Sequence, residues 1–130
     1  MVANSNGKRT QPWEAAYPGT TAEHLAVVHY ATPGFVGTVL FVGIQRCLAE
    51  SGADAGLAIW DVSNPASPAE LGFVPTGRGS RGVHEFTVRQ QGDRWIAYLA
   101  VPNSEVSSDG LGDLRIVDVT DPRVPVPLID

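Results

Sequence analysis

Two histidines of the chain stand directly beside glutamates, as Glu23-His24 and His84-Glu85. Imidazole nitrogens suit Zn, Cu, Fe or Ni, and a neighbouring carboxylate can serve as a further ligand, as a base or as a partner that orients the ring. His24, His84 and Glu85 are therefore candidate ligands of a transition metal. Two histidines without a tight spacing are a weak metal signal, however, and structural histidines bonded to loop carbonyls are the favoured interpretation.

The other two side chains of metal-binding or nucleophilic type point to structural roles. His29 follows His24 by five residues, so the two-residue period of a strand places it on the opposite face, at the surface. Cys47 is the one cysteine and cannot form an internal disulfide. We expect it to behave as a small buried hydrophobe, with a bond to a missing segment, a metal ligand or a reactive thiol as the alternatives.

Three loops carry residues of the kind that could do chemistry, but all three are predicted to be connections. Ser80 lies in the flexible, cationic run 77–82, which lacks the Gly-x-Ser-x-Gly spacing of a hydrolase nucleophile. The acidic loops 48–56 and 103–113 carry oxygen ligands of the kind that calcium prefers. Neither has the alternating carboxylates and closing glutamate of an EF-hand, so we expect solvated loops.

The elements that position these residues come from an internal repeat. The run 56–68 returns as 113–125, and Asp61 and Asp118 are corresponding positions of the two copies. Each copy is a short β-prone run that ends in Asx-Pro turn chemistry, as Ser63-Asn64-Pro65 shows in the first copy. The sequence therefore predicts a strand and a Pro-defined turn in each copy, and the same aspartate at both turns indicates a structural role for it.

Flanking segments extend each copy to four strands. Apolar runs at 24–28 and 38–43, and again at 84–88 and 95–101, are each separated by a turn and predict two hairpins. The histidines His24 and His84 would then occupy equivalent positions at the start of the first strand. The runs 69–74 and 126–129 are predicted as fourth strands, the second at an outer edge because Pro127 lacks an amide donor.

The motifs 57–65 and 114–122 resemble the LxIxDVSDP core of LVIVD-repeat proteins, a bacterial and archaeal group of predicted β-propellers that are often surface-associated. The resemblance covers roughly residues 20–130, with Trp60 in place of the usual small aliphatic residue. It implies an all-β fold of four-stranded antiparallel blades, with about two blades of an incomplete propeller because closed rings need at least four. An independent sandwich or open sheet is the alternative.

The resemblance divides the chain into three parts. Residues 1–19 are expected to form a partly disordered N-terminal extension, with Trp13 and Tyr17 as possible anchors. The first blade is assigned to 20–76 and the second, truncated at its C-terminus, to 77–130. Unpaired strands at the blade edges predict self-association through these edges.

The composition of the chain limits the classes of fold and function that it can have. The chain has 14 Gly and 10 Pro in 130 residues, more than a helical domain usually tolerates. A formal net charge of -5 argues against nucleic acid as a partner. No apolar run approaches the roughly 18 residues that span a bilayer. The N-terminus lacks a secretory signal pattern, and the sequence assigns no compartment.

Three function classes remain. The leading one is a non-catalytic binding or scaffolding module of a propeller, with an unknown ligand or protein as its partner. The second is part of a His-ligated, metal-dependent propeller enzyme such as an oxidoreductase, similar only in that general sense to the methanethiol oxidases of the selenium-binding-protein family. The third is a truncated product without a function of its own. Metal content separates the first two classes, and cooperative unfolding separates both from the third.

Overall fold

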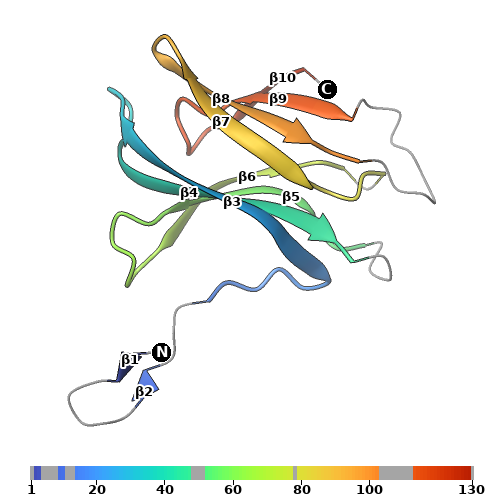
Figure 1. The fold of residues 1–130 in the computed structure, drawn as a ribbon, viewed down its shortest axis with the longest axis horizontal. Coiled ribbons are helices and arrows are strands. Elements are labelled where there is room, and N and C mark those ends of the chain that lie inside the picture. Colours follow the sequence, from blue (N-terminus) through green and yellow to red (C-terminus); the bar gives the residue numbers. More distant parts are fainter. Residues whose placement is uncertain are drawn as a thin grey trace.

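The computed structural model describes residues 2–3, 9–10, 14–47, 52–77, 79–102 and 113–129. Every regular element in these ranges is a β-strand (Figure 1). The strands are β1 (Val2–Ala3), β2 (Arg9–Thr10), β3 (Thr20–Ala31), β4 (Val36–Arg46), β5 (Gly56–Asp61), β6 (Ala69–Pro75), β7 (Glu85–Gln91), β8 (Arg94–Ala100), β9 (Leu114–Asp118) and β10 (Val126–Ile129). No helix in the described residues is long and apolar enough to cross a membrane.

The strands form two four-stranded antiparallel sheets and one short pair. Sheet 1 has the order β3-β4-β5-β6, and sheet 2 has the order β7-β8-β9-β10, so chain neighbours are always sheet neighbours. β1 and β2 pair only with each other. This arrangement confirms the all-β fold class, with two propeller blades that are not closed into a ring. It also confirms the two predicted hairpins and the edge position of β10.

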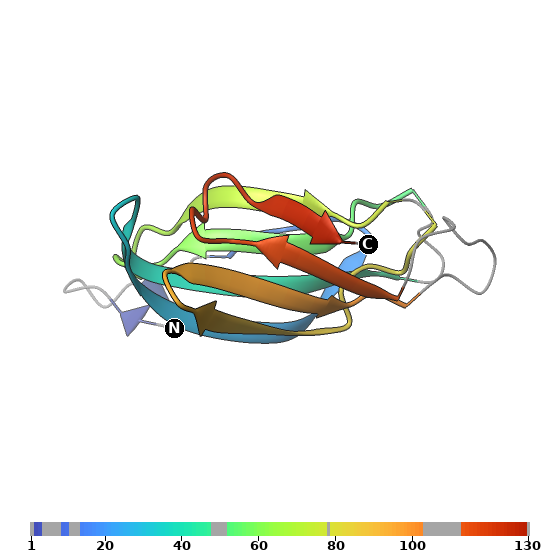
Figure 2. The ribbon, with the colours of Figure 1, turned by 90° about the horizontal axis from the view of Figure 1, so that it is seen from above.

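The two sheets stack face to face, with the main core between them. Seen from above, sheet 2 lies over sheet 1 with β7 on the side of β3 and β10 on the side of β6 (Figure 2). Of the strands in different sheets, β3 and β7 approach each other most closely. We call the two faces that meet the inner faces and the two that point away the outer faces. Fully buried side chains of the inner faces include those of Phe41, Leu57, Ile59, Leu99 and Val117.

The strand patterns show which residues belong to each face. β3 alternates between partly buried His24, Ala26 and Val28 on the inner face and exposed positions on the outer face. β4 is buried on both faces from Phe41 to Gln45. A strand covered on one side only would alternate, so the continuous burial shows that sheet 1 is also covered on its outer side.

The linker between the sheets is fixed to the end of β4. The amide of Val83 donates to the Ile44 carbonyl (3.1 Å), and the amide of Arg46 donates to the Arg81 carbonyl (2.8 Å). Gly82 has a φ of +100°, and a Cβ there would collide with the Ile44 carbonyl. A left-handed backbone this close to a strand needs glycine. The linker therefore holds sheet 2 at a set position over sheet 1.

Candidate functional site

His24 lies on the inner face of β3 and packs against sheet 2. Its ring is nearly perpendicular to the Phe86 ring, with a centroid separation of 4.9 Å and an interplanar angle of 80°. His29 lies on the opposite face, exposed, with Nδ1 3.1 Å from the Thr38 hydroxyl. The predicted opposition of the two histidines is confirmed. The ring of His24 thus takes part in the contact between the sheets.

Glu85 is the first residue of β7, His84 directly precedes it, and both residues are exposed. The amide of His84 donates to the Ala100 carbonyl (3.0 Å), and its side chain borders a shallow hollow with Pro102 and Asp113. Glu85 pairs with Ala100 in the sheet. His84 therefore precedes the strand on which the sequence interpretation placed it.

The pairing of the strands shows that His24 and His84 do not occupy equivalent positions, contrary to what the sequence had suggested. His24 pairs with Gly43 and Glu85 pairs with Ala100, while Gly43 and Ala100 are corresponding positions at the spacing of the internal repeat. The counterpart of His24 is therefore Glu85, and His84 lies just before it. The predicted equivalence of His24 and His84 was therefore wrong. Corresponding residues of β3 and β7 lie one position further apart in the sequence than the two histidines do, and the sequence pattern did not resolve this difference.

No group of three or more His, Cys, Asp or Glu side chains is placed to hold a metal within the described part of the chain. Metal binding by His24, His84 and Glu85 stays a prediction. Cys47 is a free, half-buried thiol whose amide donates to the Gly19 carbonyl (2.9 Å). Most of the acidic loop 103–113, and part of the loop 48–56, lie outside the described residues.

Ser80 lies in the linker between the two sheets, and its hydroxyl forms hydrogen bonds that hold this linker. It is fully buried, its hydroxyl donates to Thr76 Oγ1 (2.8 Å), and the hydroxyl oxygen accepts from the Gly82 amide (3.2 Å). The guanidinium of Arg46 donates to the carbonyls of Ser80 (2.6 Å) and Ala53 (2.9 Å). A buried hydroxyl that already has a donor and an acceptor is not presented to a substrate. The interpretation of this run as a connection is confirmed.

The Pro turns after β5 and β9 repeat the same hydrogen bonds. Asp61 Oδ1 accepts from the Ser63 amide (2.9 Å), and Asp118 Oδ1 accepts from the Thr120 amide (2.9 Å). The hydroxyls of Ser63 and Thr120 each accept an amide from the second strand of their own sheet (2.9 Å in both cases). Both aspartates are therefore structural acceptors, as the recurrence in the sequence predicted.

Hydrogen bonding favours the charged form of both aspartates. The pKa of Asp61 is held below its ordinary value by hydrogen bonds from the Ser63 hydroxyl and amide. Burial opposes the charge of Asp118, but hydrogen bonds from Thr120 and Arg94 outweigh burial and lower its pKa. Arg94 Nη2 lies 2.6 Å from Asp118 Oδ2, within sheet 2. The charges of both turns thus stabilise the folded chain.

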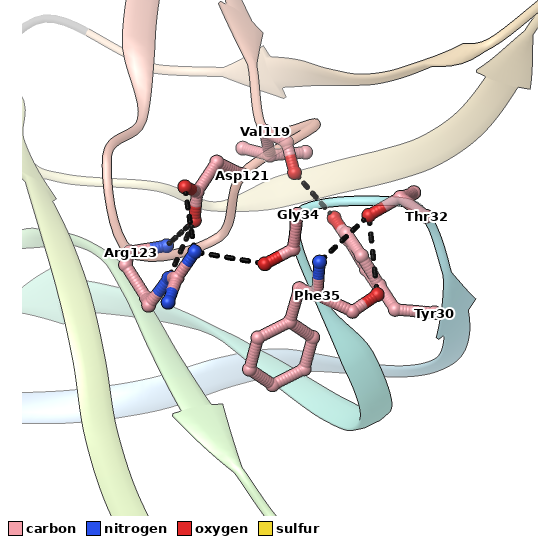
Figure 3. Close-up of polar contacts among 7 residues, drawn as sticks. All are labelled: Tyr30, Thr32, Gly34, Phe35, Val119, Asp121 and Arg123. Carbon is pink, nitrogen blue, oxygen red and sulfur yellow. Dashed lines mark hydrogen bonds and ion pairs between the residues drawn. The ribbon is translucent and has the colours of Figure 1, made fainter.

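A clasp of four residues joins the second Pro turn to the first hairpin; its members are Tyr30, Phe35, Asp121 and Arg123 (Figure 3). The Tyr30 hydroxyl donates to the Val119 carbonyl (2.6 Å). Asp121 holds the Arg123 guanidinium (2.9 Å), which donates to the Gly34 carbonyl (2.8 Å) and lies 6.0 Å from the centre of the Phe35 ring. Sequence reasoning missed this contact, although Arg123 differs from its counterpart Ala66, and that difference was the available signal.

The outer face of sheet 1 is apolar and half covered. Tyr17, in the segment before β3, stacks on Phe73 with a centroid separation of 6.1 Å and accepts a hydrogen bond from Trp60 Nε1 (3.0 Å). Tyr17 therefore anchors the N-terminal extension, whereas Trp13 lies outside the described residues. On the β3 side of this face, Leu25 and Val27 are each 60% exposed.

The outer face of sheet 2 carries polar as well as apolar side chains. Leu114 is 55% exposed and Val126 is 49% exposed on its β9–β10 side. Thr87 and Tyr98 line an open hollow beside them, and the Tyr98 hydroxyl bonds with Gln91. Both outer faces therefore carry large apolar side chains in contact with water.

These features define a class: an open stack of two four-stranded propeller blades with a repeated Asx-Pro turn. The family model of the LVIVD repeat matches residues 52–76, which hold β5, the first Pro turn and β6. The chain thus carries an LVIVD repeat, a repeat associated with β-propeller folds. No curated protein and no solved structure matches the chain.

Proposed function

We propose that the chain is a non-catalytic binding or scaffolding module of a β-propeller. The observation that carries the proposal is the exposure of large apolar side chains on both outer faces, such as Leu25 and Val27 on one and Leu114 on the other. Soluble proteins rarely leave such groups together on a regular face unless the face meets a partner. The sheets thus offer binding surfaces on both sides of one rigid core.

The polar groups support the same function. Ser80 and the turn aspartates Asp61 and Asp118 are engaged in hydrogen bonds that hold loops and turns. A catalytic centre needs a nucleophile, base or electrophile aimed at an accessible space. The repeated polar residues instead build the frame that carries the two outer faces.

Metal content tests this function. Mass spectrometry for elements on the purified chain is expected to give far less than one transition metal per chain, and a chelator is expected to leave thermal unfolding unchanged. The same measurement on the double variant His24→Ala/His84→Ala is the control. A near-stoichiometric metal that the double variant loses would replace the proposal with the metal-dependent enzyme.

Cooperative unfolding tests whether the module folds on its own. The shared core between the sheets predicts a single transition, with the same midpoint by tryptophan fluorescence and by far-UV circular dichroism. Non-coincident or absent transitions would favour a product without an independent function and would contradict a scaffolding role for the chain by itself.

A further inference from the structure

We propose that a second copy of this chain packs on the outer face of sheet 1, through the outer face of sheet 2 of that copy. The association is head to tail, and repetition of it joins copies into a closed ring. The inference rests on the proposed function, because it names the partner of the two binding faces.

The outer face of sheet 1 corresponds to the buried inner face of sheet 2. Leu25 pairs with Val42 as Phe86 pairs with Leu99, and Val42 and Leu99 are corresponding positions at the spacing of the internal repeat. Neighbouring positions follow the same register. The corresponding pairs are Leu25 and Phe86, Val27 and Val88, Leu40 and Ala97, Val42 and Leu99, and Trp60 and Val117. The apolar face that sheet 1 turns outward is thus the kind of face that sheet 2 already buries.

The outer face of sheet 2 corresponds in turn to the buried inner face of sheet 1. Tyr98 pairs with Ile116 as Phe41 pairs with Ile59. The corresponding pairs are Ala26 and Thr87, Val39 and Ile96, Phe41 and Tyr98, Leu57 and Leu114, and Ile59 and Ile116. The two outer faces of one molecule are therefore counterparts of the two faces that already meet inside it.

The established interface between the sheets supplies the geometry of the new one. Within the chain, Phe86 lies against His24 and Phe41, at centroid separations of 4.9 and 6.5 Å. The same stacking between copies brings Leu25 of one copy to Glu85 and Tyr98 of the next. The apolar contact is between Leu25 and the Tyr98 ring, while Glu85 lies at the strand end, where its carboxylate reaches water.

The cover on sheet 1 leaves the needed part of its outer face open. Tyr17 lies over Trp60 and Phe73 of β5 and β6, and it also packs against the buried cluster of Val42, Ile44 and Ala58, which reaches β4. Leu25 and Val27 on β3 stay exposed, and β3 is the strand of closest approach in the internal interface. The contact between copies therefore uses the uncovered β3 side, where Leu25 and Val27 lie, with Tyr17 beside it over β4, β5 and β6.

Two different faces in contact make a heterologous interface, which forms rings when the rotation closes. Propellers close with about 4–8 blades, so two blades per copy give rings of about two to four copies. The exposed apolar side chains of both faces become buried in such a ring. The sequence pointed to blade edges for self-association, whereas the register of the sheets assigns it to faces.

Solution mass provides the test. Light scattering on a sizing column, over a range of concentrations, is expected to show assemblies of about two to four times 13.8 kDa. Val27→Glu alters only the outer face of sheet 1, and Leu114→Glu alters only that of sheet 2; both residues are more than half exposed, so both variants should fold. Each variant alone is expected to be monomeric.

A mixture of the two variants distinguishes head-to-tail packing from other contacts. Each variant keeps the face that the other has lost, so an equimolar mixture is expected to form a heterodimer that grows no further. Val124→Glu, at a 62% exposed turn position away from both outer faces, is the matched control and should assemble as the unaltered chain does.

Two results would overturn the proposal. A chain that stays monomeric at all concentrations, while unfolding cooperatively and holding no metal, would reject self-assembly and leave the proposed binding function standing. A dimer that one variant abolishes and the other leaves intact would show that like faces meet, which is incompatible with head-to-tail packing.

Discussion

The inner and outer faces of the two sheets occupy corresponding positions but differ in environment. Phe41 is fully buried between the sheets, while its counterpart Tyr98 lies half-buried beside an open hollow. Phe86 is 7% exposed, and its counterpart Leu25 is 60% exposed. The comparison shows that a repeated strand pattern specifies a pair of complementary faces, and that burial depends on whether a neighbouring sheet is present.

The largest effect is expected from removing an inner-face aromatic. Phe41→Ala should lower the free energy of unfolding by about 3–5 kcal/mol, because it leaves a cavity in the shared core. The matched change Tyr98→Ala should cost the unassociated chain much less, since Tyr98 is only half-buried. Urea unfolding at low protein concentration measures both. Equal losses would show that the inner and outer faces contribute equally to the stability of the unassociated chain, which would contradict the difference described above.

The second-largest loss of stability is expected from removing the hydrogen bond that Tyr30 forms in the clasp. Tyr30→Phe removes the donor to the buried Val119 carbonyl and should cost about 1–3 kcal/mol, because that acceptor then lacks its partner. Burial raises the pKa of Tyr30, so the hydroxyl stays protonated and can donate throughout the neutral range. Tyr98→Phe, whose bond to Gln91 is exposed, is the control and should change stability far less. A similar small loss in both variants would contradict a buried inter-sheet bond.

Acidification should weaken both Pro turns. The pKa values of Asp61 and Asp118 are lower in the folded chain than in the unfolded chain, so their stabilisation is present above the unfolded value of about 3.9 and is lost as the pH falls through the folded values. Thermal midpoints measured from pH 6 down to pH 2.5 should fall mainly below about pH 4.5.

The variant Asp61→Asn/Asp118→Asn tests the cause of this fall. Its midpoint should be lower at pH 6 and should change less on acidification, because neither turn then carries a titrating carboxyl. An unchanged slope would assign the acid sensitivity to other carboxyl groups and would contradict a shared role for the two turns.

The smallest effect is expected from the exposed part of the clasp. Arg123→Ala should lower the free energy of unfolding only slightly, since half of its side-chain surface is exposed and surface ion pairs contribute little. The loss should shrink as salt is raised, because its charged contacts are screened. Arg94→Ala, which removes a pair within sheet 2 only, serves for comparison in urea unfolding at two ionic strengths. A loss as large as that of Tyr30→Phe would show that Arg123 holds the sheets together more strongly than its exposure implies.

The sequence predicted the strands of the two four-stranded sheets well because their signals are local. Alternation in β3, the Pro turns after β5 and β9, and the proline in β10 each depend on neighbouring residues. The stacking of the sheets depends on distant residues, so the contact of Tyr30 with Val119 had no local signal.

The candidate site was harder to predict than the fold. His24 and His84 look alike in the sequence, but register is set by pairing across the sheet, and the pairing of Glu85 with Ala100 moves the correspondence to the next position along the strand. Side chains alternate between faces along a strand, so even the smallest shift in register changes which face a group occupies. Ligand geometry inferred from repeat position therefore needs the strand pairing.

The linker glycine has a consequence for the shape of any assembly. Gly82 lets the chain run close to the end of β4 before β7 begins, and a Cβ there would push the linker away from the Ile44 carbonyl. The angle between neighbouring sheets decides how many of them complete a circle. We therefore expect Gly82 to set the angle between neighbouring sheets. If the chain still folds, Gly82→Ala should change the curvature of the stack without altering either of the surfaces that meet.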